Sequence, residues 1–328
     1  MADDMAGAGN ETPMALPPPE VVPRDISAYR RGNTGTDYVF RFDSGRAGPA
    51  VGVAGLTHGN EVCGMTAVTA LLDAGVRPER GSLVLWLGNV AAYERLRADD
   101  PANQTRHRFV DRDMNRAWGD DVVLGDRHSV EARRVRELLP FVEGLDALLD
   151  IHSTTFCERP FFVGPGLPRN RVLADAIGVP PTQVYMRGSQ YSGLTMAERG
   201  RFADPDARAT CIAVECGTHL SSAAGRLAHE VALRFLAHHG ILPDAALPPP
   251  APRDPPARYE IRQVYRPARD GARFARAFAP FEEVSEGEPI VLDGDMVFAA
   301  PFDRCTILMP SPRPARGRDM VTLATPLG

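Results

Sequence analysis

The sequence predicts an α/β protein with a mostly parallel mixed sheet flanked by helices, and a small all-β domain at its C-terminal end. Three observations support this fold class. Short apolar runs alternate with stretches of helical spacing from residue 38 to residue 239, which is the pattern of βα units. A proline-dense stretch follows at 243–257. Beyond it, 258–328 holds only short apolar runs between Gly, Pro and Asp turns, which is typical of an all-β region.

The expected strands of the α/β part are short runs of mainly apolar residues, as strands buried on both faces require. In chain order they cover 38–42, 50–55, 82–88, 145–154, 161–164 and 210–217. The expected helices carry apolar residues three and four positions apart. They cover 60–74, 90–98, 129–142, 170–178, 193–200 and 222–239. Ser129 is a suitable N-cap and Gly178 a suitable C-cap, and the polar stretch 99–127 is expected to be a long loop.

These elements divide the chain into four expected parts. Residues 1–30 are polar, include a run of prolines and predict a flexible N-terminal tail. Residues 31–242 form the α/β part, which contains all the motifs described below. Residues 243–257 are expected to be an extended linker. Residues 258–328 are expected to be the C-terminal β domain, acting as a lid or an oligomer contact.

Composition excludes several classes of function. The net charge of −5 predicts no basic surface for nucleic acid. No apolar run reaches the roughly 18 residues of a membrane span, and the first residues, MADDMAGAGNETP, lack the positive charge and apolar core of a signal peptide, so a cytoplasmic protein is expected. All 37 basic residues are arginine, which excludes Schiff-base, P-loop and carrier lysines. The five cysteines contain no CxxC pair and predict neither disulfides nor a cysteine metal site.

Two histidines and a glutamate follow expected strands, at the sheet edge where α/β proteins bind ligands. His58 and Glu61, in 56-LTHGNEVCG-64, come after one strand, and His152 ends another. Taken singly, the first two could be a surface pair and His152 a hydrogen-bonded core residue. Together they form a His₂Glu set, which is a known catalytic zinc set with one position left for water. Asp150 lies on the same strand face as His152, either as support for that histidine or as an unrelated polar contact.

The charged stretch 106-RHRFVDRDMNRAW-118 predicts an anion site, with a solvated loop as the alternative. Four of its residues are arginines. Arg116 can hold a carboxylate with two parallel hydrogen bonds, and Asn115 can add another. Arg108 is a candidate to polarise a scissile carbonyl.

Glu215, in 212-IAVECGTH-219, follows an apolar strand, where a carboxylate must be paired, solvated or functional. A structural salt bridge is one explanation. Beside a catalytic zinc ion, Glu215 would instead be the base that takes a proton from water. The segment before this strand contains Arg187 and Tyr191, which are candidates for substrate contacts, with ordinary loop packing as the alternative.

Four motifs in this order, HGNE, DxNR, DIHST and VECG, resemble the succinylglutamate desuccinylase/aspartoacylase family, which is related to zinc carboxypeptidases. The resemblance covers roughly residues 50–240 by ordered motifs and extends weakly through 278–310. It implies a zinc carboxypeptidase-like fold with one Zn²⁺ per chain. The roles that it implies are zinc ligands for His58, Glu61 and His152, base and acid for Glu215, carbonyl polarisation for Arg108, and carboxylate binding for Asn115 and Arg116.

Two features of the family have no clean counterpart. For a further pocket arginine, which precedes the catalytic glutamate in human-type aspartoacylases, Arg201 and Arg208 are the candidates, and neither aligns cleanly. Those enzymes also use a tyrosine from the C-terminal domain, and 288–310 contains none. The side-chain end of the substrate pocket is therefore expected to differ from theirs.

The resemblance implies a zinc-dependent amidohydrolase that cleaves the acyl amide of a small N-acyl amino acid to a carboxylate and a free amino acid. A zinc metallocarboxypeptidase acting on short peptides is the nearest alternative, because the same groups serve both reactions. An inactive binding protein for acidic metabolites is the alternative of another class. The expected partner is the small-molecule substrate, with a possible homo-oligomer and without nucleic acid or membrane.

Overall fold

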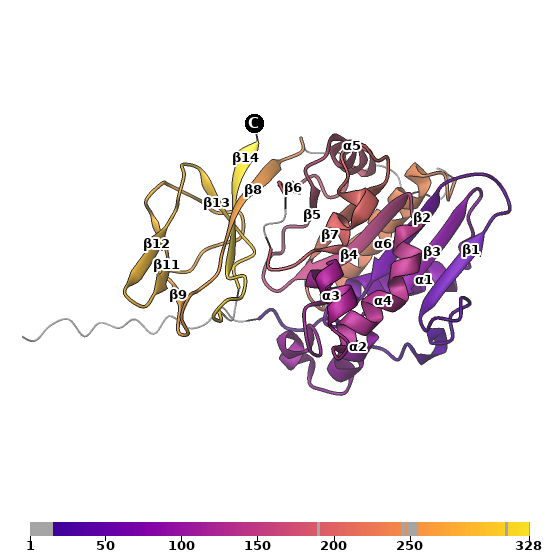
Figure 1. Cartoon of the computed structure of the whole chain (residues 1–328), viewed down its shortest axis with the longest axis horizontal. Helices are drawn as coiled ribbons and strands as arrows, with labels where there is room; N and C mark the ends of the chain where they lie inside the picture. The colour runs from indigo at the N-terminus through magenta and orange to yellow at the C-terminus, as the bar shows by residue number, and fades with distance from the viewer. Residues whose placement is uncertain (1–15, 189–190, 244–246, 248–254, 312–313, 328) are drawn as a thin grey trace, which may run out of the picture.

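The computed structural model describes residues 16–188, 191–243, 247, 255–311 and 314–327. Its main element is an eleven-stranded mixed sheet that runs from the α/β part into the C-terminal region (Figure 1). The strands of the α/β part are β1 Val39–Asp43, β2 Ala50–Gly55, β3 Ser82–Leu87, β4 Ala147–Thr154, β5 Phe161–Pro165, β6 Gln183–Met186 and β7 Thr210–Thr218. The α-helices are α1 Val62–Asp73, α2 Val90–Arg97, α3 Asp120–Gly125, α4 Val130–Glu143, α5 Pro168–Ile177 and α6 Ser222–His238.

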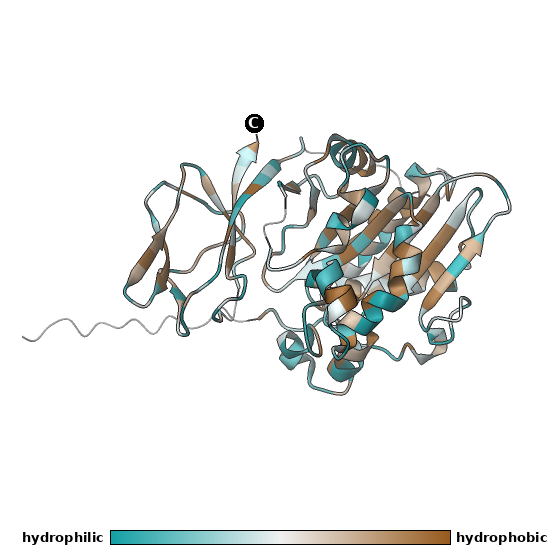
Figure 2. Ribbon diagram, in the orientation of Figure 1, coloured by the Kyte–Doolittle hydropathy of each residue, from teal (hydrophilic) through white to brown (hydrophobic). Residues whose placement is uncertain are grey.

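The central strands are buried on both faces. β3, β2, β4 and β7 lie side by side in parallel, and every residue of β3 and β4 is buried. Successive residues point to opposite faces, so Leu149 packs in the same core as α1 and α6, while Leu148 packs in the same core as α3 and α4. Figure 2 shows the apolar strands between helices that carry hydrophilic residues. The predicted α/β fold is confirmed. No helix in the described part of the chain combines the length and apolarity that crossing a membrane requires.

Residues 20–29 are held against the α/β part. The backbone amide of Glu20 donates to the carbonyl of Leu220 at 3.0 Å. Ile26 is fully buried in the core that α1 and α6 share. The predicted flexible tail is therefore wrong for this stretch, because burial of Ile26 stabilises an ordered path; residues 1–15 lie outside the described residues.

The helix predicted for 193–200 is wrong. The chain forms only two short 3-10 turns there, Met196–Glu198 and Gly200–Phe202. Between them Arg199 is extended, with ψ at 129°, and Gly200 has a positive φ of 50°. An α-helix cannot continue through this pair of conformations. In the α/β part, strand β6 and helix α3 are also not among the elements that the sequence predicts.

The C-terminal strands are β8 Arg258–Tyr265, β9 Arg273–Phe274, β10 Glu283–Val284, β11 Pro289–Asp293, β12 Met296–Ala299, β13 Cys305–Leu308 and β14 Val321–Leu327. β8 pairs in parallel with β6, and β14, β13 and β10 continue the same sheet. β9, β11 and β12 form a separate three-stranded sheet. The predicted β character is confirmed, and the shared sheet places this region beside the α/β part. The domain boundaries stay a prediction, and most of the predicted linker lies outside the described residues.

Candidate metal centre

His58, Glu61 and His152 converge at the carboxyl ends of β2 and β4. His58 follows β2, Glu61 directly precedes α1, and His152 lies near the end of β4. All three are buried, and their ligand atoms lie within 4.8 Å of one another. His58 Nδ1 lies 2.8 Å from Glu61 Oε1, and His152 Nδ1 lies 2.7 Å from Glu61 Oε2. Two imidazole nitrogens and a carboxylate fit the His₂Glu donor set of zinc.

Glycines allow the backbone segments that carry the three donors to lie close to neighbouring segments. Gly55, at the end of β2, faces Gly64 of α1, and a Cβ on Gly55 would lie 2.5 Å from the Gly64 carbonyl oxygen. A Cβ on Gly59, inside the HGNE motif, would lie 2.5 Å from Ala92. A larger residue at either position would push backbone segments apart and separate the three donors.

The second nitrogen of each histidine faces an aspartate. His152 Nε2 lies 2.7 Å from Asp150 Oδ2, and Asp150 Oδ1 accepts from the Thr57 hydroxyl at 2.7 Å. His58 Nε2 lies 2.9 Å from Asp113 Oδ1. Carboxylates at these positions accept the Nε2 protons and so direct both Nδ1 lone pairs toward the metal position.

The cluster attracts positive charge. Burial alone would lower the pKa of His152, but Asp150 and Glu61 raise it well above its ordinary value. Burial alone would raise the pKa of Glu61, but His58 and His152 hold it well below its ordinary range. A divalent cation would replace the proton that these carboxylates favour, so metal binding should release protons.

We expect Asp150→Asn to weaken zinc binding by about 10–100-fold, because the amide no longer fixes the tautomer of His152 or raises its basicity. The amide is nearly the size of the carboxylate, so packing around β4 is preserved. A competition titration of the purified protein against a chelator of known affinity measures the change. Unchanged zinc affinity would show that Asp150 is only a polar neighbour of the histidine.

Glu215 lies beside this cluster on β7, opposite His152 in the register of the sheet. It is half-buried, and its Oε2 is a buried atom that has no hydrogen-bond partner among the described residues. Burial raises the pKa of Glu215 to about 8. A divalent cation nearby would favour the charged form. An unpaired carboxylate oxygen next to a metal position is available to take a proton from water.

A buried glutamate fixes the loop that carries the arginines. Glu131, in the first turn of α4, accepts hydrogen bonds from the backbone amides of residues 110–112. It also accepts from Asn89 Nδ2 at 2.9 Å. Because Glu131 is fully buried, its oxygens need these partners. No sequence pattern indicates this role, since a glutamate in the first turn of a helix is common.

Asp113 joins this loop to the metal cluster. It accepts from the Asn115 amide at 2.8 Å and from Arg108 Nε at 3.2 Å. Burial alone would raise the pKa of Asp113, but Arg108 and His58 hold it well below its ordinary range. Arg108 Nη1 donates to Glu61 Oε1 at 3.1 Å. Within the described residues, Arg108 Nη2 has no hydrogen-bond partner, so one donor beside the metal position remains for a substrate oxygen.

Arg116 and Asn115 lie at the other end of the loop. The Arg116 guanidinium stacks on Tyr191, with Cζ 4.2 Å from the ring centroid. Its Nη1 donates to the Asn115 carbonyl at 2.8 Å, and its Nη2 lies 3.4 Å from Asp319 Oδ2. Its Nε is buried without a partner in the described part of the chain. Asn115 Oδ1 accepts from the Met196 amide at 3.2 Å. The guanidinium is therefore held in place while a buried donor remains unused.

These side chains surround one small cavity of about 90 Å³. The predicted site residues in its walls are His58, Arg108, Asn115, Arg116, His152, Tyr191 and Glu215. The C-terminal region contributes Met309 to the wall, and Thr195, which precedes the 3-10 turn Met196–Glu198, also lines it. The sequence had indicated neither of these residues.

Three arginines that were candidates for substrate contacts lie outside the cavity wall. Arg187 is not in the cavity wall; its side chain is 79% exposed and it pairs with Glu260 at 3.2 Å. Arg201 and Arg208, the candidates for the further pocket arginine, are also exposed, and Arg201 pairs with Asp146 at 3.0 Å. Among the described residues, Arg108 and Arg116 are the arginines of the cavity wall.

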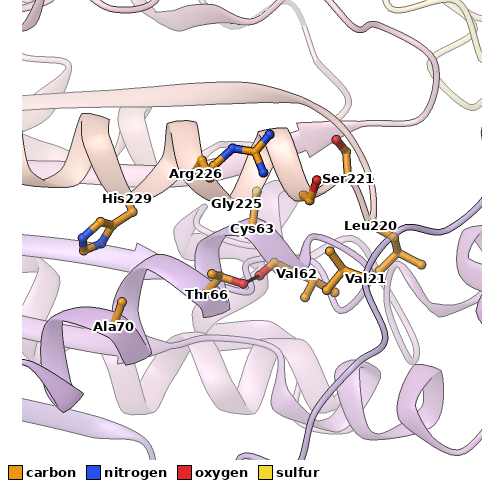
Figure 3. Close-up of a pocket in the computed structure, with 11 residues that line it drawn as sticks. Val21, Val62, Cys63, Thr66, Ala70, Leu220, Ser221, Gly225, Arg226 and His229 are labelled. Carbon is orange, nitrogen blue, oxygen red and sulfur yellow. Dashed lines mark hydrogen bonds between the residues drawn. The ribbon is translucent and has the colours of Figure 1, made fainter.

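A larger cavity, of about 400 Å³, lies between α1 and α6. Figure 3 shows Cys63 and Thr66 of α1 near Gly225 and Arg226 of α6, with Val21 close to one end. The described residues that line it include no carboxylate. The smaller cavity is lined by His58, His152 and Glu215, and it is therefore the candidate active site.

A family model described as the succinylglutamate desuccinylase/aspartoacylase catalytic domain matches residues 47–228. That range includes all three candidate metal ligands and Glu215. Among curated proteins, no match to the chain is found.

Several solved structures share the fold. Succinylglutamate desuccinylase from Vibrio cholerae is 18% identical, covering 88% of this chain and 85% of that one, with a TM-score of 0.66. The succinylglutamate desuccinylase/aspartoacylase from Rhodobacter sphaeroides is 20% identical, covering 86% and 87%, with a TM-score of 0.60. The ectoine utilization protein from Ruegeria pomeroyi, in a product-bound structure, is 15% identical, covering 93% of both chains, with a TM-score of 0.61.

Proposed function

Because the chain belongs to the succinylglutamate desuccinylase/aspartoacylase family, we propose that it is a zinc-dependent hydrolase that cleaves the acyl amide of a small N-acyl amino acid. The products would be a carboxylate and a free amino acid. One observation carries the proposal: His58, Glu61 and His152 converge within 4.8 Å, and His152 lies opposite Glu215, whose Oε2 has no hydrogen-bond partner among the described residues.

The three donors would hold the zinc ion, and Glu215 would move the proton. A zinc ion in this position would supply Lewis acidity next to the acyl carbonyl and the attacking water. Glu215 accepts the proton of that water and later delivers it to the departing amine. General acid–base catalysis of this kind contributes roughly 10²–10⁴-fold. The unpaired Oε2 supports this role, because no other side chain competes for it among the described residues.

Arg108 would stabilise the negative charge that develops on the carbonyl oxygen. Two of its nitrogens are fixed by Asp113 and Glu61, at 3.2 Å and 3.1 Å. A donor that is held before the reaction needs no reorganisation when the charge appears. Its remaining Nη2 supplies that hydrogen bond in the proposed mechanism.

Arg116 and Asn115 would bind the carboxylate of the substrate, with Tyr191 as the stacking surface for Arg116. The cavity volume of about 90 Å³ supports a small acyl group over a long peptide. Arg187 is not proposed as a contact, because the cavity wall does not include it. The cytoplasmic location and a possible homo-oligomer stay predictions from the sequence.

A panel of substrates tests the function. We expect the zinc-loaded protein to hydrolyse at least one N-acetyl- or N-succinyl-amino acid, and a chelator to abolish the rate until zinc is restored. Release of the free amino acid measures turnover. Faster cleavage of short peptides would favour the metallocarboxypeptidase alternative. Binding of N-acyl amino acids without any turnover would favour an inactive binding protein.

A further inference from the structure

The guanidinium of Arg116, which is proposed to bind the substrate carboxylate, also contacts Asp319, a residue far away in the sequence. Asp319 lies two residues before β14, and its Oδ2 is 3.4 Å from Arg116 Nη2. Both side chains are largely shielded from solvent, with 22% and 18% exposed. Arg318, the preceding residue, contacts the ring of Phe109 with a cation–π distance of 5.8 Å, which joins this part of the C-terminal region to the arginine loop.

Arg266 holds the other oxygen of Asp319. Its Nε donates to Asp319 Oδ1 at 2.7 Å. The sheet sets up this contact, because Val321 of β14 pairs with Tyr265 of β8, and Asp319 and Arg266 extend from these strands. A charge-assisted hydrogen bond has a length of about 2.7–2.9 Å. Asp319 is therefore bound closely by Arg266 and only loosely by Arg116.

A substrate carboxylate and Asp319 would compete for the same donors. Bidentate hydrogen bonding of a carboxylate uses two nitrogens of one guanidinium. In Arg116, Nη1 is bonded to a backbone carbonyl, Nη2 faces Asp319, and Nε is buried without a partner among the described residues. Two carboxylates at one guanidinium also repel each other.

We propose that Asp319 is a specificity-determining residue that opposes carboxylate binding at Arg116, and that Arg266 weakens this opposition by holding Asp319 away. The inference rests on the proposed role of Arg116 in carboxylate binding. Two independent restraints already position Arg116, namely the Tyr191 ring and the Asn115 carbonyl, so the guanidinium does not need Asp319 to stay in place.

Two variants should shift the affinity for succinate in opposite directions. Calorimetric titration of the zinc-loaded protein with succinate is expected to give about two- to fivefold tighter binding for Asp319→Asn and about two- to fivefold weaker binding for Arg266→Gln. In an Arg116→Gln background, Asp319→Asn should have no effect. Neutral succinamide and the exposed control Asp303→Asn should show no such change.

A loss of affinity in Asp319→Asn would overturn the proposal, since it would mean that Asp319 positions Arg116. No change in either variant, or no saturable succinate binding in Asp319→Asn, would overturn it as well. With a substrate from the panel, Asp319→Asn should lower KM while kcat stays near the wild-type value. Because succinate binding needs no turnover, the affinity shifts can appear even if no N-acyl amino acid is hydrolysed, which separates this inference from the proposed function.

Discussion

Replacing Glu215 by glutamine is expected to lower kcat by about 10²–10⁴-fold while zinc stays bound. Glutamine has nearly the same shape but cannot accept a proton from water. Glu215 is not one of the three converging donors, so the metal should be retained. Steady-state kinetics with the best substrate of the panel, together with elemental analysis of the same sample, measures both quantities.

The control for this variant is Glu286→Gln, which removes one negative charge from an exposed position of the C-terminal region. It should leave kcat and zinc content unchanged. If Glu215→Gln kept near wild-type kcat, another group would have to move the proton. If it lost zinc, Glu215 would belong to the metal site rather than beside it.

Replacing Glu61 by glutamine is expected to reduce zinc affinity beyond the roughly 10–100-fold that a supporting residue contributes, and to abolish turnover with it. Glu61 is the only anionic donor of the set and contacts both histidines. It also pairs with Arg108 at 3.1 Å. Without the charge of Glu61, Arg108 loses a counter-charge and the free energy of unfolding should fall. Because the Arg108 side chain is 36% exposed, the loss should stay below the roughly 3–5 kcal/mol of a fully buried pair.

Zinc competition titration and urea unfolding in the presence of a chelator measure the two effects of Glu61→Gln. Glu79→Gln, at an exposed position after α1, is the matched control and should change neither. Zinc content and stability near those of the wild-type protein would contradict the assignment of Glu61 as a ligand.

The sequence was sufficient to predict that His58, Glu61 and His152 converge, because these residues lie at or just after the ends of strands. His58 and His152 follow apolar runs that had to be buried strands, and parallel strands bring their carboxyl ends to one edge. The spacing of Glu61 from His58 places both donors where α1 begins. The structure bears out this convergence at a single buried point.

Contacts between distant segments could not be predicted in the same way. Asp113 reaches His58 across 55 residues, and Asp319 reaches Arg116 across 203. Such pairs depend on how the loop packs and on β6 pairing with β8, which carries the C-terminal strands into the main sheet. Local patterns also failed at Gly200, where a positive φ ended a stretch that reads as helical.

Anomalous diffraction at the zinc absorption edge, from crystals of the protein loaded with zinc, is the most direct test of the proposed zinc centre. We expect a strong peak about 2.0–2.2 Å from His58 Nδ1, His152 Nδ1 and a Glu61 carboxylate oxygen. A map with no peak there, while both histidines keep their direct contacts with Glu61, would contradict the zinc centre and the hydrolysis that depends on it.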